Sequence, residues 1–301
     1  MSTAIAVAAG LGSAIAYGAA TAGQHAAAYT GDGEADAGRL ADLLRNPRWL
    51  VATAGDVLGA LLQIVALSNG PVVLVQPLLV LALPIAVAIR SWFGEPRPSS
   101  TDLLNCALVI LALSGFFALL GEPSRGRIIG TASAAWATSI AFVAGGLAIL
   151  VVRHRSPVIR AVVFGVVAGC WFGLVSVLIE AVSSVWEKQG LEGFGDPEGF
   201  VPLVCVIGLA VVGYLLVQIG FQIGPLGASF PANLILDPVT AVVLGAVLLG
   251  EQVPTGGAKV LGYLVCLIVL AYAAVRLAQP PPAAVSGVRA QPAGTSGILD
   301  I

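Results

Sequence analysis

The chain has 301 residues, of which 58% are hydrophobic and only 10% are charged, and its formal net charge is −2. A water-soluble domain carries roughly a quarter of its residues as charged side chains, so this composition excludes an ordinary soluble fold. The surface has to face lipid instead. We therefore expect an all-α polytopic membrane protein.

Nine apolar stretches are long enough to cross a hydrocarbon core of about 30 Å. They cover residues 3–24, 49–69, 71–89, 103–120, 128–152, 158–185, 200–222, 224–250 and 260–275. The stretches are continuous rather than alternating, and this pattern predicts helices instead of barrel strands.

The basic side chains are divided unequally between the two sides that these nine spans define. Ten lie on the side of the carboxyl terminus: Arg39, Arg45, Arg48, Arg90, Arg97, Arg153, Arg155, Arg160, Arg276 and Arg289. Four lie on the other side: Arg125, Arg127, Lys188 and Lys259. Since cytoplasmic loops carry the excess of basic residues, we expect a multi-pass protein of the cytoplasmic membrane, with the N-terminus outside and the C-terminus inside.

An internal repeat relates two parts of the chain. The segment "GPVVLVQPLLVLALP", residues 70–84, has the same proline spacing as "GPLGASFPANLILDP", residues 224–238. Pro71, Pro77 and Pro84 correspond to Pro225, Pro231 and Pro238, each 154 positions later. "GEPRP", residues 94–98, corresponds to "GEQVP", residues 250–254, at an offset of 156, and we expect the two extra residues in a loop.

The two copies are expected to lie in opposite orientations. Five predicted crossings separate Pro71 from Pro225, and an odd number inverts the second copy. Two inverted-topology repeats are typical of alternating-access carriers, although a duplicated structural bundle is the alternative. We divide the chain into a first repeat of four spans (1–120), with an interfacial helix near 37–46, a second repeat of five spans (121–278), and a disordered cytoplasmic tail (279–301).

The paired prolines are candidate helix breaks. Pro84 and Pro238, with Pro77 and Pro231 before them, fall inside predicted helices, where a proline removes an amide donor and disturbs the carbonyl four residues earlier. Irregular backbone at membrane depth is tolerated where it lines a cavity or packs in protein. We expect the matched kinks to line a central cavity, while packing kinks remain the alternative.

Asp237 is the strongest candidate for a substrate or ion-binding residue. An ionisable group within a span is a functional hypothesis by default. Ser229, Asn233 and Thr240 share its helical face, and the corresponding positions of the first copy are apolar. This acid in one copy only is suited to binding a cation or a proton, whereas capping of the backbone before Pro238 is the alternative.

Asp56 and Gln63, seven residues apart on one face of the second span, are further candidates. The alternative for Asp56 is a carboxylate near the cytoplasmic entrance, paired with an arginine such as Arg48. Glu180 is expected at the outer interface rather than at the site.

Two further polar stripes could line a pathway or join helices by hydrogen bonds. They comprise Ser13, Tyr17, Thr21 and Gln24 on the first span, and Tyr214, Gln218 and Gln222 on the seventh. The sequence contains neither a Ser/His/Asp constellation nor a phosphate-binding glycine loop, so we expect no enzyme.

The repeats and the segment Trp49 to Pro98 resemble the drug/metabolite transporter (EamA-like) superfamily, and more particularly the NIPA-type magnesium transporter branch. The resemblance rests on "RNPRWLVATAGDVLGALLQIVALSNGPVVLVQPLLVLALP" and on Gly224 to Pro254. It implies a carrier fold of nine spans. The NIPA pattern has an acid at the position of Ala60 and an amide at Gln63, whereas this chain has its acid one turn earlier, at Asp56.

The expected function is secondary transport of a small solute, either a metabolite or drug or a divalent cation. Asp237 and Asp56 would be the metal ligands if the substrate is Mg²⁺, and a NIPA-like Mg²⁺ transporter is the specific alternative. A non-transporting membrane scaffold or regulatory subunit is the alternative of another class. We expect no cofactor beyond Mg²⁺ or H⁺ as substrate or coupling ion, the lipid bilayer as partner and no nucleic acid; a homodimer stays open.

Overall fold

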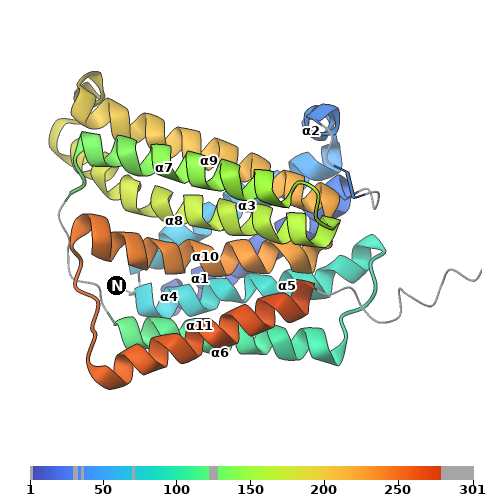
Figure 1. The fold of residues 1–301 in the computed structure, drawn as a ribbon. Coiled ribbons are helices and arrows are strands. Elements are labelled where there is room, and N and C mark those ends of the chain that lie inside the picture. The colour runs from blue at the N-terminus through green and yellow to red at the C-terminus, as the bar shows by residue number, and fades with distance from the viewer. Residues whose placement is uncertain (1–2, 30–32, 35–36, 70–71, 122–127, 279–301) are drawn as a thin grey trace, which may run out of the picture.

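The computed structural model describes residues 3–29, 33–34, 37–69, 72–121 and 128–278, and within these ranges it contains helices and no strand (Figure 1). In chain order the α-helices are α1 (Thr3–Ala28), α2 (Ala37–Leu43), α3 (Pro47–Asn69), α4 (Val72–Val80), α5 (Ala82–Ile89), α6 (Ser100–Leu120), α7 (Thr131–Val152), α8 (Pro157–Gln189), α9 (Pro197–Ile223), α10 (Leu226–Leu244) and α11 (Gly257–Ala278). The expected tail 279–301 and the Gly70-Pro71 turn lie outside the described residues.

Eight helices of the described chain are long and apolar enough to cross a membrane. They are α1, α3, α6, α7, α8, α9, α11, and α10 with its continuation to Leu249. An all-helical polytopic protein is thus confirmed. The stretch 71–89, expected as a further crossing, is not one continuous helix, because it is divided between α4 and α5.

The division between α4 and α5 falls at Leu81, three residues before Pro84. The amide of Leu81 donates to the carbonyl of Leu78 at 3.2 Å, which is a bond of the tighter 3₁₀ type. Pro84 has no amide hydrogen to offer Val80, so the regular bonding pattern is interrupted in this turn. The backbone of Pro77 lies within α4, while its side chain is outside the described part.

The second copy of the proline pattern behaves differently. Helix α10 runs through Pro231 and Pro238 without interruption, so the helix breaks expected at these two positions are not observed. Each proline removes one amide donor, and the surrounding bonds maintain the helix.

The two-residue slip between the copies also lies in helix rather than in the expected loop. The first copy ends in a 3₁₀ helix, η1 (Arg90–Phe93), and the second ends in a π-helix, η3 (Gly245–Leu249). Each is followed by a glycine with positive φ, Gly94 and Gly250.

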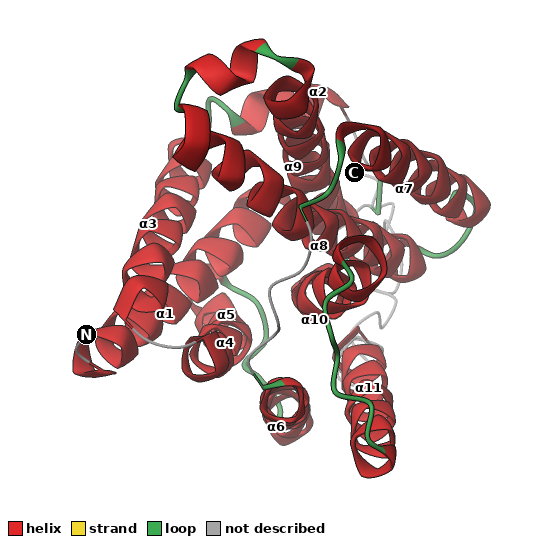
Figure 2. Ribbon diagram, turned by 90° about the vertical axis from the view of Figure 1, so that its left-hand side faces the viewer, coloured by secondary structure: helices red, strands yellow, loops and turns green. Residues whose placement is uncertain are grey.

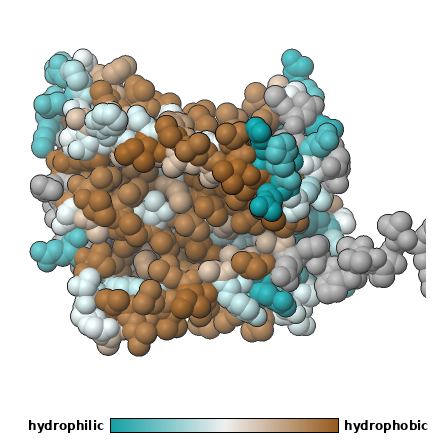
Figure 3. Space-filling view, in the orientation of Figure 1, coloured by the Kyte–Doolittle hydropathy of each residue, from teal (hydrophilic) through white to brown (hydrophobic). Residues whose placement is uncertain are grey.

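The outside of the bundle is mainly apolar. Figure 3 shows a broad hydrophobic band between hydrophilic groups at the two ends of the molecule. Helix α7 lies at the periphery, where Trp136 and Val151 are largely exposed. An apolar surface of this extent is stable in lipid and not in water.

The helices form two sets that face each other across the bundle (Figure 2). The first set comprises α1, α3, α4, α5 and α6, and the second comprises α7, α8, α9, α10 and α11. Helix α1 packs mainly on α3 and on α4–α5, and α8 packs mainly on α9 and α10. Helices α6 and α11 pack on each other. Helix α7 contacts α8 and α9.

Three glycines bring α8 unusually close to α10. Gly165, Gly169 and Gly173 recur every four residues, so they share one face of α8. A Cβ atom at these positions would lie 2.2–2.7 Å from the backbone carbonyl oxygens of Ser229, Asn233 and Asp237, respectively. Small residues at this spacing allow helix backbones to touch in membranes.

We predict that Gly169→Ala lowers the thermal unfolding midpoint of the detergent-purified protein. The added methyl would lie 2.7 Å from the carbonyl oxygen of Asn233, and overpacking of this kind costs about 1–3 kcal/mol. Gly146→Ala on α7 is the matched control, because no atom lies within 4 Å of the new methyl. The control should leave the midpoint unchanged or raise it. Equal midpoints for both variants would contradict the close contact.

Candidate functional site

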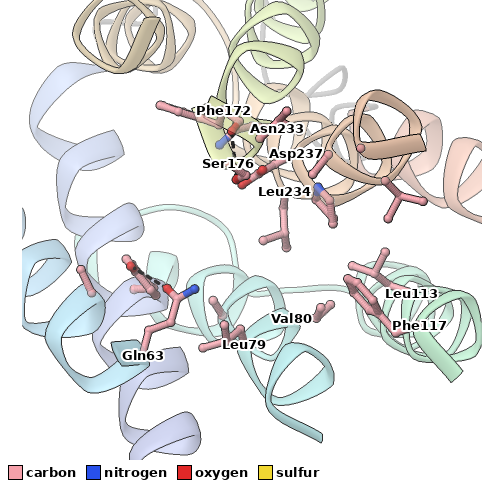
Figure 4. A pocket seen from close by; sticks show the side chains of 18 of the residues that line it. Gln63, Leu79, Val80, Leu113, Phe117, Phe172, Ser176, Asn233, Leu234 and Asp237 are labelled. Atoms are coloured by element: carbon pink, nitrogen blue, oxygen red, sulfur yellow. Dashed lines mark hydrogen bonds between the residues drawn. The ribbon is translucent and has the colours of Figure 1, made fainter. Parts of the chain in front are cut away.

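A cavity of about 770 Å³ lies between the two helix sets. Figure 4 shows Asn233 and Asp237 of α10 on one side of it, with Gln63 of α3 and Leu79 of α4 opposite. Leu113 and Phe117 of α6 form an apolar flank. The cavity is therefore an apolar chamber with a few polar side chains directed into it, as is typical of small-ligand sites.

The cavity opens at one end of the bundle. Its lining includes Gly121, which follows α6, and Glu251 and the exposed Gln252, which follow η3. These residues belong to the end of the molecule at which α6 and α10 finish (the left end in Figure 1). We call this the open end.

Only part of the polar stripe predicted on α10 lies in the cavity. Asp237, Asn233 and the adjacent Pro238 line the cavity. Ser229 is 1% exposed and packs against Gly220 instead. The hydroxyl of Thr240 points to the thiol of Cys170 at 3.5 Å. Ser229 and Thr240 are thus absent from the cavity lining, because the helical face they share with Asp237 also packs on α8 and α9.

Asn233 presents an acceptor that could receive a ligand. Its Oδ1 atom is buried and has no hydrogen-bond partner among the described residues. A buried acceptor without a partner destabilises the protein unless a bound group satisfies it. Since Asn233 lines the cavity beside Asp237, a bound cation or donor could serve both oxygens.

Asp56 and Gln63 line the cavity from α3. The carboxylate of Asp56 accepts a hydrogen bond from the side-chain amide of Gln24. Gln63 accepts a hydrogen bond from the hydroxyl of Tyr17 at 3.0 Å. Asp237 lines the same cavity from α10, so two aspartates from different helices lie around one chamber.

The polar stripes of the first and seventh spans meet at this chamber. Tyr17, Thr21 and Gln24 line it from α1, and Tyr214 lines it from α9. Gln24 donates to the oxygen of Tyr214 at 3.1 Å. Part of each stripe thus lines the cavity, and members of the two stripes also join helices by hydrogen bonds.

Two glutamates lie along the open end. Glu180 of α8, which the sequence analysis did not expect at the site, lines the cavity. Burial, and then the negative charge of Glu180, raise the pKa of the Glu251 carboxyl above its ordinary value. The open end therefore carries negative charge that would attract cations.

The opposite end of the cavity is closed around His25. This ring is 1% exposed, and its Nε2 atom lies 3.0 Å from the carbonyl oxygen of Gly224. Its Nδ1 atom lies 2.8 Å from Oε1 of Glu95, close enough for an ion pair but without the direction of an aligned hydrogen bond. His25 therefore connects Glu95, which follows η1, with Gly224, which follows α9. We call this arrangement the closing contact.

The described residues contain no group of three or more His, Cys, Asp or Glu side chains that could hold a metal ion. The cavity is thus not a complete protein cage for a bare cation. Mg²⁺ keeps several of its waters and is usually bound through one or two carboxylates, and Asp56 and Asp237 meet this lower requirement.

Several lining residues were not candidates from the sequence. Ser176 lies four residues before Glu180 on the same face of α8, and Gln252 lies in a loop. The sequence analysis used Glu251 only as part of the repeated motif "GEQVP". Its position directly after a predicted span indicated a carboxylate near the end of a membrane helix.

Comparisons with known proteins place the chain beside two relatives. It is 29% identical over 234 residues to a protein of Corynebacterium glutamicum described as uncharacterized, covering 73% of this chain and 75% of that protein. It is 24% identical over 221 residues to the probable magnesium transporter NIPA9 of Arabidopsis thaliana, covering 70% of this chain and 63% of that protein. No family profile and no solved structure matches the chain. These findings indicate a multi-span membrane protein with weak similarity to a NIPA-type transporter.

Proposed function

We propose that the chain is a secondary transporter that moves a small solute or cation through its central cavity by alternating access. The observation that carries the proposal is the cavity itself, which contains carboxylates, opens at one end and is closed at the other. A carrier needs a central site whose two ends open in turn.

The helix pairing supports an inverted repeat. Thr3 of α1 and Pro157 of α8 are 154 positions apart, as are Val72 of α4 and Leu226 of α10. In this correspondence α1, α3, α4–α5 and α6 match α8, α9, α10 and α11, and α7 stands between the copies. The pairing of α1 with α3 is repeated by α8 with α9, and α6 packs on its counterpart α11.

Mg²⁺ is the substrate that the Arabidopsis relative favours. A hydrated ion could bind Asp56 and Asp237 through its waters, in keeping with the weak protein coordination that Mg²⁺ accepts. A metabolite or a drug is the other class of substrate. The basic residues near the closed end support an orientation in which this end is cytoplasmic and the cavity opens outward.

We predict that Asp237→Asn lowers substrate flux into proteoliposomes by at least about tenfold. The substitution keeps the side-chain shape but removes the charge of one of the two aspartates that line the cavity, and hydrogen bonds to a charged group contribute about 1.5–3 kcal/mol. Flux should be followed for Mg²⁺ with an internal indicator dye. Thermal-shift assays with Mg²⁺, amino acids and cationic drugs should run in parallel, because a ligand of the folded state raises the unfolding midpoint.

Asp196→Asn is the matched control for this experiment. Asp196 is exposed, precedes α9 and is absent from the cavity lining. A stable Asp237→Asn protein with the flux of the unchanged chain would exclude Asp237 from the site. An unchanged chain that folds but transports and binds none of these solutes would favour the scaffold function.

We further predict that Glu95→Gln opens the closed end. In this state the substitution removes the negative charge that lies 2.8 Å from Nδ1 of His25, so the closing contact is weakened. Ala28 is 4% exposed and lies on the same helix as His25. In a background with the four native cysteines replaced by alanine, maleimide labelling of Ala28→Cys should accelerate at least about fivefold.

Asp102→Asn provides the control for the closing contact. Asp102 pairs with Arg90 at 2.9 Å, an ion pair that does not include His25. Its loss should not accelerate labelling at position 28. Equal acceleration by both substitutions, or by neither, would show that the closing contact does not hold the two sets together.

A further inference from the structure

Two close backbone contacts support one register between α1 and α8 in the proposed repeat. A Cβ atom at Gly18 of α1 would lie 2.7 Å from the carbonyl oxygen of Ala82. A Cβ atom at Gly173 of α8 would lie 2.6 Å from the carbonyl oxygen of Asp237. Both members of the second contact come 155 positions after those of the first, one more than the offset between the prolines. The two glycine contacts are therefore equivalent in the repeat.

This register pairs the closing contact with two acids at the open end. At an offset of 155, Glu180 of α8 is the counterpart of His25 of α1. Glu251, in the repeated motif "GEQVP", is the counterpart of Glu95. Glu180 and Glu251 line the cavity at its open end, whereas His25 and Glu95 are in contact at the closed end. Corresponding residues are thus joined at one end of the bundle and face the cavity at the other.

The corresponding side chains differ in their capacity to donate a hydrogen bond. An imidazole ring always carries at least one N–H donor. The ring of His25 lies 3.0 Å from the carbonyl oxygen of Gly224 and 2.8 Å from Oε1 of Glu95. A glutamate carboxylate offers acceptors only. Glu180 consequently cannot copy the contacts of His25, and its negative charge repels that of Glu251.

We infer that Glu180 is a gating residue that keeps the open end open, because it places an acceptor and a negative charge where the closing contact requires a donor. This role rests on the proposed transport function, since it uses the inverted repeat and its two alternating openings. It accounts for a bundle that is closed around His25 and open beside Glu180.

The test measures distances across both ends by pulsed electron paramagnetic resonance of the full-length protein in detergent, with the four native cysteines replaced by alanine. Spin labels at Val65→Cys of α3 and Val247→Cys of η3 flank the open end. Labels at Val51→Cys of α3 and Ile159→Cys of α8 flank the closed end. All four positions are exposed.

Glu180→Gln should shift the distances across the open end toward shorter values. Glutamine has the size of glutamate, but it carries no charge and has an N–H donor. The ratio of the short-distance to the long-distance population should rise by about three- to tenfold, the range that one hydrogen bond supports. Across the closed end the distances should lengthen or stay unchanged.

Glu187→Gln is the matched control. Glu187 lies seven residues later on α8, is exposed and is absent from the cavity lining. Its substitution should leave the distances at both ends unchanged. Glu180→His places the residue type of the closed end at this position, and it retests the proposal with the same expected shift if Glu180→Gln does not fold.

A shortening across the open end in Glu180→Gln or Glu180→His, without one in Glu187→Gln, supports the proposal. Unchanged distances in the folded Glu180 variants overturn it, and so do an equal shift in Glu187→Gln and a shortening across both ends. The distances need no substrate. Absence of transport in the unchanged protein would therefore overturn the proposed function and leave the gating result standing.

Discussion

In a chain surrounded by lipid, each buried polar group has to find its partner within the protein. Several buried polar groups meet this constraint here through contacts that also join the two helix sets. The Gln24 amide binds Asp56 on α3 and Tyr214 on α9, and His25 reaches Glu95 of one set and Gly224 of the other. The polar groups that define the cavity are consequently the groups that hold its walls in place.

Helix α10 can present Asn233 and Asp237 to the cavity because its other face is fixed. The glycine face of α8 receives the backbone of α10 at Ser229, Asn233 and Asp237. Contact through the backbone leaves the side chains of Asn233 and Asp237 free to lie in the cavity. Helix α10 thus carries the candidate binding residues on one face and the close contact with α8 on another.

The sequence was sufficient to predict the membrane class, the helical structure and most span boundaries, because lipid demands long apolar helices. It did not predict that Leu81 would divide the third stretch, since a proline kinks or breaks a helix according to its neighbours. Spacing placed Ser229 and Thr240 on the face of Asp237, but only the positions of α8 and α9 decide which part of that face is covered. The bond between Gln24 and Gln218 joins residues 194 positions apart, and periodicity carries no information at that range.

The different endings of α5 and α10 explain how the two copies can differ by two residues. A 3₁₀ helix rises about 2.0 Å per residue, more than the 1.5 Å of an α-helix. The four residues of η1 therefore span a greater length along the helix axis than four α-helical residues would. The wider π turn of η3 places more residues in a similar height. Each copy therefore brings its Gly-Glu pair to the membrane boundary, at Glu95 and Glu251. The two-residue difference between the corresponding segments is thus matched by the winding of the backbone and not by a longer loop.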